Sequence, residues 1–336
     1  MRRLLLLALL ATTLLLAGYR ELHAPVRAPG APEQTLNVPS GASVDAIGRQ
    51  LRALGLVRHP WVFRAWVLAR GAGARLRAGE YALEGPLSLA PIVDMLVRGE
   101  VVHHEITFPE GKTLEDMALL ATGHGLAAAA FSRAARDPAA IRDLDPLATD
   151  LEGYLFPDTY ELAATPEAAP LLVARMVQRF REVVSSLRPP LAASGLTLRE
   201  AVTLASIVEA ETAQSLERPR VAAVFLNRLR KGMPLQTDPT VIYALRRAGS
   251  WDGNIRKKDL DLDSPYNTYR HAGLPPGPIG NPGRESLQAV LQPAKVEDLY
   301  FVSRNDGSHQ FSQTLAEHER AVDRYQRHRP QPRRGT

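Results

Sequence analysis

Two glutamates lie two residues apart near the middle of the chain, and either could donate a proton to a substrate. Leu204, Ile207 and Val208 recur with helical spacing, and Glu211 continues the same stripe. Glu209 falls on another face, because residues two apart on a helix do not share a side. We therefore expect Glu211 at the edge of apolar packing and Glu209 nearer water. Burial raises the pKa of a carboxyl, and an acid that stays protonated near neutral pH can protonate a leaving oxygen.

Polar, mostly uncharged side chains follow these glutamates. Asn227 lies off the apolar face of a second predicted helix, and Gln236, Thr237 and Asp238 belong to a loop punctuated by glycine and proline, 232–240. Such groups beside an isolated acid suit a sugar better than a phosphate or a metal. Helix capping and turn chemistry would explain the same residues, and an amphipathic helix with two acidic residues would explain the glutamates.

Several long motifs resemble one known family. The chain is similar to the YceG-like endolytic murein transglycosylases in the runs ASIVEAET, VAAVFLNRL, GMPLQTDPTVIYAL, SPYNTYRHAGLPPGPIGNPG, DGSHQFSQTLAEH and EGYLFPDTY. The similarity covers most of the chain beyond its first few dozen residues. In this family the acid is the glutamate directly before a threonine, which corresponds to Glu211.

The resemblance implies further site residues and a reaction. Tyr243 belongs to a shared motif, Asn267 and Tyr269 lie in a proline-stiffened loop, and Glu152 and Asp158 flank the aromatic residues of EGYLFPDTY. The implied reaction is cleavage of a peptidoglycan strand, in which a sugar 6-hydroxyl closes a 1,6-anhydro ring. It needs neither a metal nor another cofactor.

Other functions remain open from the sequence. A glycan hydrolase would need a second carboxylate, for which Asp238, Asp158 and Glu152 are candidates. A non-catalytic scaffold that binds cell-wall glycan or its synthases would carry the same polar loops. No lysine lies in a context typical of a Schiff base. His309 and His318 do not have the spacing of a zinc site, so we expect no metal.

Composition excludes some functions. The 336 residues carry a formal net charge of +5 and no cysteine. Disulfides, thiolate metal sites and a lipidated N-terminal cysteine are therefore excluded. No block of lysine and arginine interleaved with aromatic residues is present, which argues against nucleic acid as a partner.

The N-terminus predicts a membrane anchor over residues 1–22. Arg2 and Arg3 precede an apolar run, Leu4–Gly18, that would form roughly 22 Å of helix, short of a ~30 Å bilayer core. A cleaved signal peptide is the alternative. The resemblance implies a single uncleaved anchor, with a single-pass protein in the inner membrane and a periplasmic catalytic domain. Nascent glycan strands and the peptidoglycan synthases are then the expected partners.

The fold class that we predict is α+β in several parts. A linker rich in proline and alanine is expected at 23–34, a small LysM-like module at 35–104, a larger mixed catalytic domain at 105–325 and a basic tail at 326–336. A turn followed by a capped helix occurs twice, at Pro39–Ser43 and at Pro109–Thr113.

Overall fold

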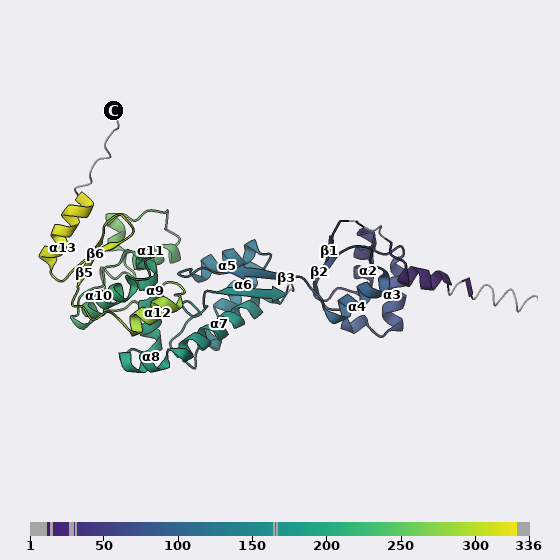
Figure 1. Ribbon diagram of the computed structural model, residues 1–336, viewed down its shortest axis with the longest axis horizontal. Helices are drawn as coiled ribbons and strands as arrows, with labels where there is room; N and C mark the ends of the chain where they lie inside the picture. The colour runs from purple at the N-terminus through teal and green to yellow at the C-terminus, as the bar shows by residue number, and fades with distance from the viewer. Residues whose placement is uncertain are drawn as a thin grey trace, which may run out of the picture. The chain divides into compact units, whose positions relative to one another are not determined.

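The computed structural model describes residues 12–13, 16–26, 30, 32–163, 165 and 167–327 (Figure 1). The chain forms two compact units. The first is built from the chain up to Ile106 together with Glu161–Ala168, and the second from Thr107–Tyr160 together with the chain from Ala169 onward. Helices and, within the described residues, three two-stranded sheets confirm the predicted α+β class.

The first unit has the order strand, helix, helix, strand, helix. Its elements are β1 (Gln34–Val38), α2 (Val44–Ala53), α3 (Pro60–Ala69), a 3-10 turn (Gly73–Arg75), β2 (Gly79–Leu83) and α4 (Leu89–Arg98). Strands β1 and β2 are antiparallel, with Leu36 opposite Tyr81. Both of these side chains are buried, as is Phe63 of α3, so the three helices and the two-stranded sheet share one apolar core.

The second unit contains the remaining helices and a hairpin. Strands β3 (His103–Thr107) and β4 (Thr159–Ala163) form a two-stranded sheet. The other elements are α5 (Leu114–Gly123), α6 (Ala128–Ala135), a 3-10 turn (Pro138–Ala140), α7 (Ala168–Ser186), α8 (Arg188–Ser194), α9 (Leu198–Glu211), α10 (Arg218–Arg230), α11 (Asp238–Arg247), a 3-10 turn (Lys257–Asp261), α12 (Arg284–Leu291), β5 (Tyr300–Ser303), β6 (His309–Ser312), α13 (Leu315–Val322) and a π-helical turn (Asp323–Arg327).

Helix α9 is the central element of the second unit. It begins at Thr197, whose hydroxyl accepts a hydrogen bond from the backbone N–H of Glu200 at 3.2 Å in a capping box. Every residue from Ala201 to Val208 is buried, and the helix packs against α10, α11 and α12 (Figure 1). A helix surrounded in this way fixes its last residue, Glu211, firmly against the rest of the unit.

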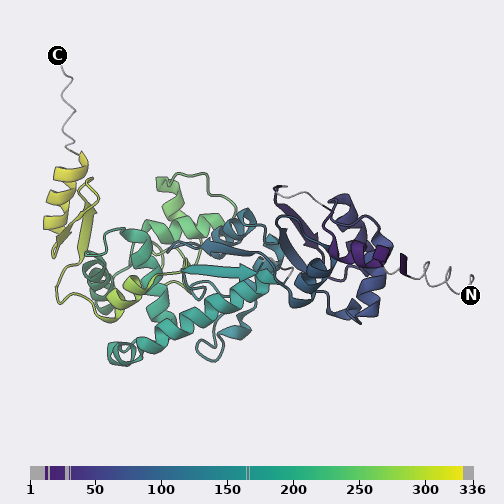
Figure 2. The same ribbon diagram turned by 45° about the vertical axis from the view of Figure 1, so that its right-hand side comes forward.

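The hairpin β5–β6 closes the C-terminal part of the second unit. Phe301 of β5 pairs with Phe311 of β6, and the turn between them contains Asn305 and Gly307 at positive φ. Helix α13 packs on both strands, as the yellow segments of Figure 2 show. The hairpin and α13 therefore form one packed end of the second unit.

The repeated turn-and-helix pattern forms as expected in both places. Gly41 and Gly111 have φ angles of 74° and 75°, which residues other than glycine rarely adopt. Ser43 and Thr113 then cap α2 and α5, each accepting a bond from a backbone N–H three residues later. The same turn followed by an N-cap thus starts a helix in each unit.

Most of the predicted anchor lies outside the described residues. Of residues 1–22, the structure describes 12–13 and 16–22, all of them helical. Within the described ranges, no single helix has both the length and the apolar composition needed to cross a bilayer; α8 and α9 pass that test only together, as a pair bent by 96°. Residues 328–336 of the predicted tail are also outside the described part.

Gly153, in the motif EGYLFPDTY, allows two segments to approach α9 closely. Its φ is 86°, and a Cβ added there would lie 2.5 Å from the ring of Pro278 and 2.9 Å from Val202. Gly195 has a similar φ of 73°, with nothing within 4 Å of such a Cβ. A side chain would therefore strain the backbone at either position. Only at Gly153 would its Cβ also clash with neighbouring atoms.

We predict that Gly153→Ala destabilises the second unit more than Gly195→Ala does. Backbone strain costs about 1–2 kcal/mol at each site, and overpacking adds about 1–3 kcal/mol at Gly153 alone. Denaturant titration of the two variants measures the difference. Equal losses would contradict the packing role assigned to Gly153.

Candidate active site

A groove of about 370 Å³ opens in the second unit where α9 ends. Its lining comes from the end of α9, from α10, from the loop before α11 and from the hairpin with α13. The residues that line it are Glu211, Arg228, Leu235, Gln236, Asp238, Tyr269, Phe301, Val302, His318 and Val322. The groove combines apolar surface with a few polar groups and falls within the volume range of small-molecule sites, ~300–1,000 Å³.

Glu211 is the last residue of α9 and its carboxyl lies in this groove. The hydroxyl of Thr237 donates a hydrogen bond to Oε1 of Glu211. Burial raises the pKa of Glu211 to about 6, the Thr237 hydroxyl lowers it, and the negative charge of Asp238 raises it. Its position at the C-terminal end of a helix, where the dipole disfavours negative charge, acts in the same direction as burial. At pH 7 about a tenth of Glu211 is therefore protonated, against about 0.3% for a carboxyl with the usual pKa of 4.5.

Glu209 has a different environment, and the expectation that it lies nearer water is wrong. Only 6% of its side chain is exposed, and it accepts hydrogen bonds from Arg218 at 2.7 Å and from the backbone N–H of Gly283 at 3.0 Å. Arg218 also pairs with Glu285 at 3.0 Å and Glu110 at 3.4 Å. The sequence pattern could not reveal this, because Arg218 supplies the buried partner from the next helix. Glu209 thus ties the end of α9 to α10 and to the start of α12.

The loop before α11 is held rigidly beside Glu211. Gln236 has a φ of 50°, an uncommon conformation for a residue with a side chain, and its N–H donates to the carbonyl of Thr268. The N–H of Thr237 donates to the hydroxyl of Thr268 at 3.1 Å, and Thr240 contacts the same hydroxyl at 2.9 Å. Gln236 is exposed in the groove, whereas Thr237 is buried beside Glu211.

Tyr269 and Asp238 form a second polar pair in the groove. The phenol of Tyr269 donates to Oδ1 of Asp238 at 2.6 Å. Asn267 is buried and does not line the groove, but its side-chain carbonyl accepts from the N–H of Tyr269 at 3.0 Å. Its amide group donates to the carbonyls of Leu260 and Leu262. Asn267 therefore shapes the loop that presents Tyr269.

Besides Thr237 and Asn267, four more predicted binding residues do not line this groove. The side-chain amide of Asn227 donates to the carbonyls of Val296 and Asp298, both at 2.9 Å. Asp158 accepts from Arg179 at 2.9 Å. The hydrogen bonds of these two side chains hold segments of the chain together. Their contact with a substrate stays a prediction.

The other two belong to a buried network. Glu152 accepts from the N–H of Leu114 at 3.1 Å and from the phenol of Tyr243 at 3.2 Å. Burial raises the pKa of Glu152 well above its usual value. Tyr243 lines a separate cavity of about 490 Å³ together with Arg247 and Trp251. Substrate binding by Glu152 and Tyr243 likewise stays a prediction.

Six groove residues were not among the predicted ligands, and three of them, Arg228, Phe301 and His318, carry polar or aromatic side chains. Arg228 donates to the carbonyls of Leu299 at 2.7 Å and Leu235 at 2.8 Å, so it joins two walls of the groove. Phe301 and His318 come from the C-terminal hairpin and from α13. Only the order of the motifs in the chain hinted that these segments meet Glu211.

His318 offers an uncharged polar group to the groove. Its ring stacks on Tyr300 with centroids 5.2 Å apart, and burial, aided by Arg228, lowers its pKa. Within the described part of the chain its Nδ1 is buried without a hydrogen-bond partner. Among the described residues, no group of three or more histidine, aspartate and glutamate side chains is arranged to hold a metal ion.

The chain is similar to proteins of one known family. The sequence profile of the YceG-like family matches residues 36–324. A Bacillus subtilis protein named endolytic murein transglycosylase is 33% identical over 91% of this chain and 88% of its own length. The chain belongs to the YceG-like family. The suspected family is thus confirmed.

Further members support the assignment. A Streptococcus pneumoniae protein of the same name is 30% identical over 89% of this chain, which spans 59% of that longer relative. The crystal structure of a YceG-like protein from Listeria monocytogenes is 33% identical, with a TM-score of 0.58, and the match covers 86% of this chain and 99% of that one. The chain therefore shares its fold with a solved YceG-like protein.

Replacing Glu211 or Glu209 by glutamine should change the stability of the protein in opposite directions. Glu211→Gln should raise stability at pH 7.5, because the folded state disfavours the ionised carboxylate. With a pKa of about 6 against a usual 4.5, the gain grows from pH 4.5 to beyond pH 6 and reaches about 2 kcal/mol at most. Glu209→Gln should lower stability by about 2 kcal/mol, because it weakens a buried charge-assisted pair.

Urea denaturation of the two variants from pH 4.5 to 8 measures both effects, with wild type as the reference. A destabilised Glu211→Gln variant, or a Glu209→Gln variant as stable as wild type, would contradict the environments described for these carboxyls.

Proposed function

We propose that this chain is a lytic transglycosylase that cleaves peptidoglycan glycan strands at internal positions. The observation that carries the proposal is Glu211, a carboxyl with a pKa of about 6 in a groove of the second unit. The relatives named endolytic murein transglycosylase support the same activity over most of the chain.

The bond that we propose joins N-acetylmuramic acid to N-acetylglucosamine. Protonated Glu211 donates its proton to the oxygen that leaves with N-acetylglucosamine. The 6-hydroxyl of the muramic acid sugar attacks its anomeric carbon, and the Glu211 carboxylate accepts the hydroxyl proton. The products are an N-acetylglucosamine end and a 1,6-anhydro ring, with no water consumed. Because the nucleophile is already part of the sugar, a high effective molarity replaces a second catalytic carboxylate.

The other groove residues suit a sugar substrate. Phe301 and Tyr269 offer ring surfaces for the apolar faces of sugars, and Gln236 and His318 offer neutral hydrogen-bonding groups for hydroxyl and acetamido substituents. The charge of Asp238 favours the positive charge that develops on the sugar ring, and it also keeps the pKa of Glu211 raised.

A hydrolase is the second candidate function. Of the three carboxylates considered as its second catalytic group, Asp238 shares the groove with Glu211. Glu152 is engaged in the buried network with Leu114 and Tyr243, and Asp158 is paired with Arg179. A hydrolytic mechanism would therefore depend on Asp238, which makes the two mechanisms separable by mutation.

We further propose that the protein acts at the periplasmic face of the inner membrane. The sequence supports a single N-terminal anchor, and a tethered enzyme reaches nascent strands before mature wall. The β1–α2–α3–β2 order of the first unit is compatible with a LysM-like module. Encounter with the synthases that extend the strands, and with it termination of strand growth, follows from the location.

Product analysis tests the reaction. The detergent-solubilised full chain should convert purified glycan strands into fragments that end in 1,6-anhydro sugars, and Glu211→Gln should abolish this. Asp238→Asn should retain anhydro products. Mass spectrometry distinguishes these ends from reducing ends, which contain one more water. Reducing ends that vanish in Asp238→Asn would support the hydrolase, and cleavage unaffected by Glu211→Gln would leave a non-catalytic scaffold.

The pH profile tests the role of the groove in setting the acid. A general acid must be protonated, so kcat/KM should fall about tenfold per pH unit above pH 6. Thr237→Val removes a hydrogen bond that stabilises the carboxylate, so this fall should move to higher pH. Asp238→Asn removes a charge that disfavours the carboxylate, so the fall should move to lower pH.

Thr240→Val serves as a control, because Thr240 bonds to Thr237 and Thr268 and makes no hydrogen bond to Glu211. Its profile should coincide with that of wild type. Shifts of Thr237→Val and Asp238→Asn in the same direction would show that Glu211 is not the group that titrates.

A further inference from the structure

Helix α3 of the first unit is apolar on both its inner and outer sides. All of its residues except Arg64 are apolar, and Val62, Phe63 and Val67 fill the core. On the outer side Trp61 is 68% exposed and Leu68 60% exposed. A helix of a soluble domain normally carries polar residues on its outer side, so this composition indicates that the outer side of α3 meets an apolar partner.

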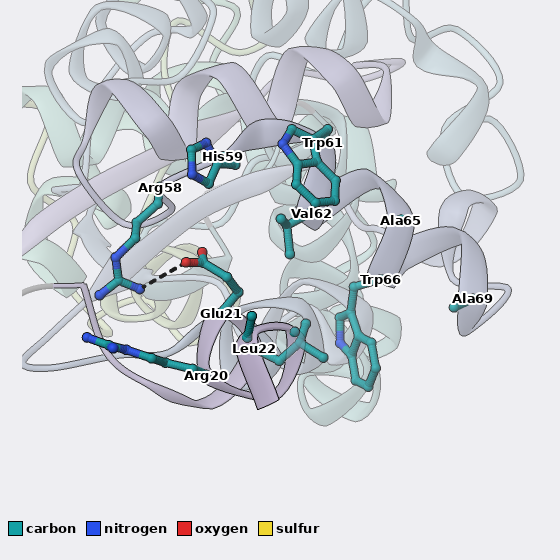
Figure 3. Close-up of a pocket in the computed structure, with 12 residues that line it drawn as sticks. Arg20, Glu21, Leu22, Arg58, His59, Trp61, Val62, Ala65, Trp66 and Ala69 are labelled. Carbon is teal, nitrogen blue, oxygen red and sulfur yellow. Dashed lines mark ion pairs between the residues drawn. The ribbon is translucent and has the colours of Figure 1, made fainter. Parts of the chain in front are cut away.

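A groove of about 750 Å³ lies beside that outer side (Figure 3). One wall is α3, with Trp61, Ala65 and Trp66. The other wall is the helical segment 16–23, which contributes Gly18 and Leu22. We call the outer side of α3 together with this groove the α3 surface.

Three arginines around the α3 surface are paired within the first unit, and Arg20 also lines the groove. Arg58 lies 3.7 Å from Glu21, the contact drawn in Figure 3, and Arg64 lies 3.0 Å from Asp45. Arg70 pairs with Asp94 and its guanidinium stacks over Trp66 at 5.7 Å. Because these arginines already have carboxylate partners, the surface offers aromatic and aliphatic contact rather than a binding site for a charged ligand.

The position of the α3 surface in the chain identifies its partner. The segment 16–23 continues the apolar run that begins at Leu4, and Tyr19, at the end of that run, is 65% exposed. If that run enters a bilayer, residues 17–22 leave it already in contact with α3. Residues 23–34, predicted as a spacer, connect this segment to β1. The spacer therefore comes after the segment that contacts α3 and does not separate the anchor from α3.

The side chains have the chemistry of a membrane interface. Tyr and Trp gather at the level of the lipid headgroups, where their rings meet apolar chains and their polar atoms meet water. Among the described residues, Tyr19 and Trp61 are the large exposed aromatic side chains, and both belong to this part of the first unit. A glycan would instead need several convergent hydrogen-bonding groups, and Arg58 and Glu21 are already paired.

We propose that the α3 surface lies in the interfacial zone of the phospholipid bilayer and holds the first unit against the membrane. This proposal rests on the membrane anchor in the proposed function and goes beyond it, since an anchor alone leaves the first unit free in solution. The contact is driven by aromatic and aliphatic burial rather than by charge, because Arg58, Arg64 and Arg70 already have carboxylate partners.

Tryptophan fluorescence of the full chain reconstituted in liposomes tests the proposal. The chain has three tryptophans. The double variant Trp66→Phe with Trp251→Phe leaves Trp61 as the probe. The double variant Trp61→Phe with Trp66→Phe leaves Trp251, in the second unit, as the matched control. Liposomes contain phospholipids brominated either near the headgroup end or near the methyl end of the acyl chain.

Bromine near the headgroup end should quench Trp61 more strongly than bromine near the methyl end, and Trp251 should stay unquenched. The result should be the same in zwitterionic and in anionic liposomes. Flotation of the liposomes reports on the anchor separately: a chain that does not float with them would refute the anchor of the proposed function.

A chain that floats while Trp61 stays unquenched would overturn the proposal and leave the anchor intact. Emission of Trp61 that changes on dilution of the protein in lipid, and not with bromine, would assign the surface to a second copy of the chain. Emission that changes only on addition of soluble glycan fragments would assign it to the substrate. Quenching in anionic liposomes alone would show that charge, rather than aromatic burial, makes the contact.

Discussion

The proposed chemistry depends on keeping one carboxyl away from water at the end of a buried helix. Glu211 belongs to α9, whose preceding residues Ala201–Val208 are all buried. The helix therefore cannot move its last residue into solvent without losing its own packing. Burial, the helix dipole and Asp238 disfavour the charged form, while the Thr237 hydroxyl limits the effect. The resulting pKa of about 6 suits a group that must give up a proton and then take one back.

The two neighbouring glutamates illustrate how local partners decide the role of a side chain. Glu209 is buried beside Arg218, and this pair joins α9 to the next helix and to the backbone at Gly283. Within the described part of the chain, Glu211 is hydrogen-bonded to a hydroxyl and to no such cation. One carboxyl thus stabilises the position of the helix end, and the other is free to exchange its proton with a ligand in the groove. Arg228 completes the arrangement by holding the loop and the hairpin together around that groove.

Much of the fold was predictable because it follows from short-range patterns. The period of apolar residues predicted α9 and α10, and the repeated turn residues predicted the starts of α2 and α5. The stripe through Leu204 and Ile207 also placed Glu211 correctly. What failed needed contacts between distant segments. Glu209 was misplaced because its partner is on α10, and His318 was missed because α13 is about a hundred residues farther along the chain. Asn267 and Asn227 show that polar residues near a site can hydrogen-bond to the backbone instead of facing the groove.

The most direct test is a titration of the Glu211 carboxyl itself. Carbon NMR of the full chain with labelled glutamate side chains follows each carboxyl with pH, and Glu211→Gln identifies the signal that belongs to residue 211. The account predicts a midpoint near pH 6, against the usual value of 4.5. A midpoint at or below 4.5 would mean that Glu211 is ionised whenever the enzyme is active, and it would contradict the role of this residue as the proton donor.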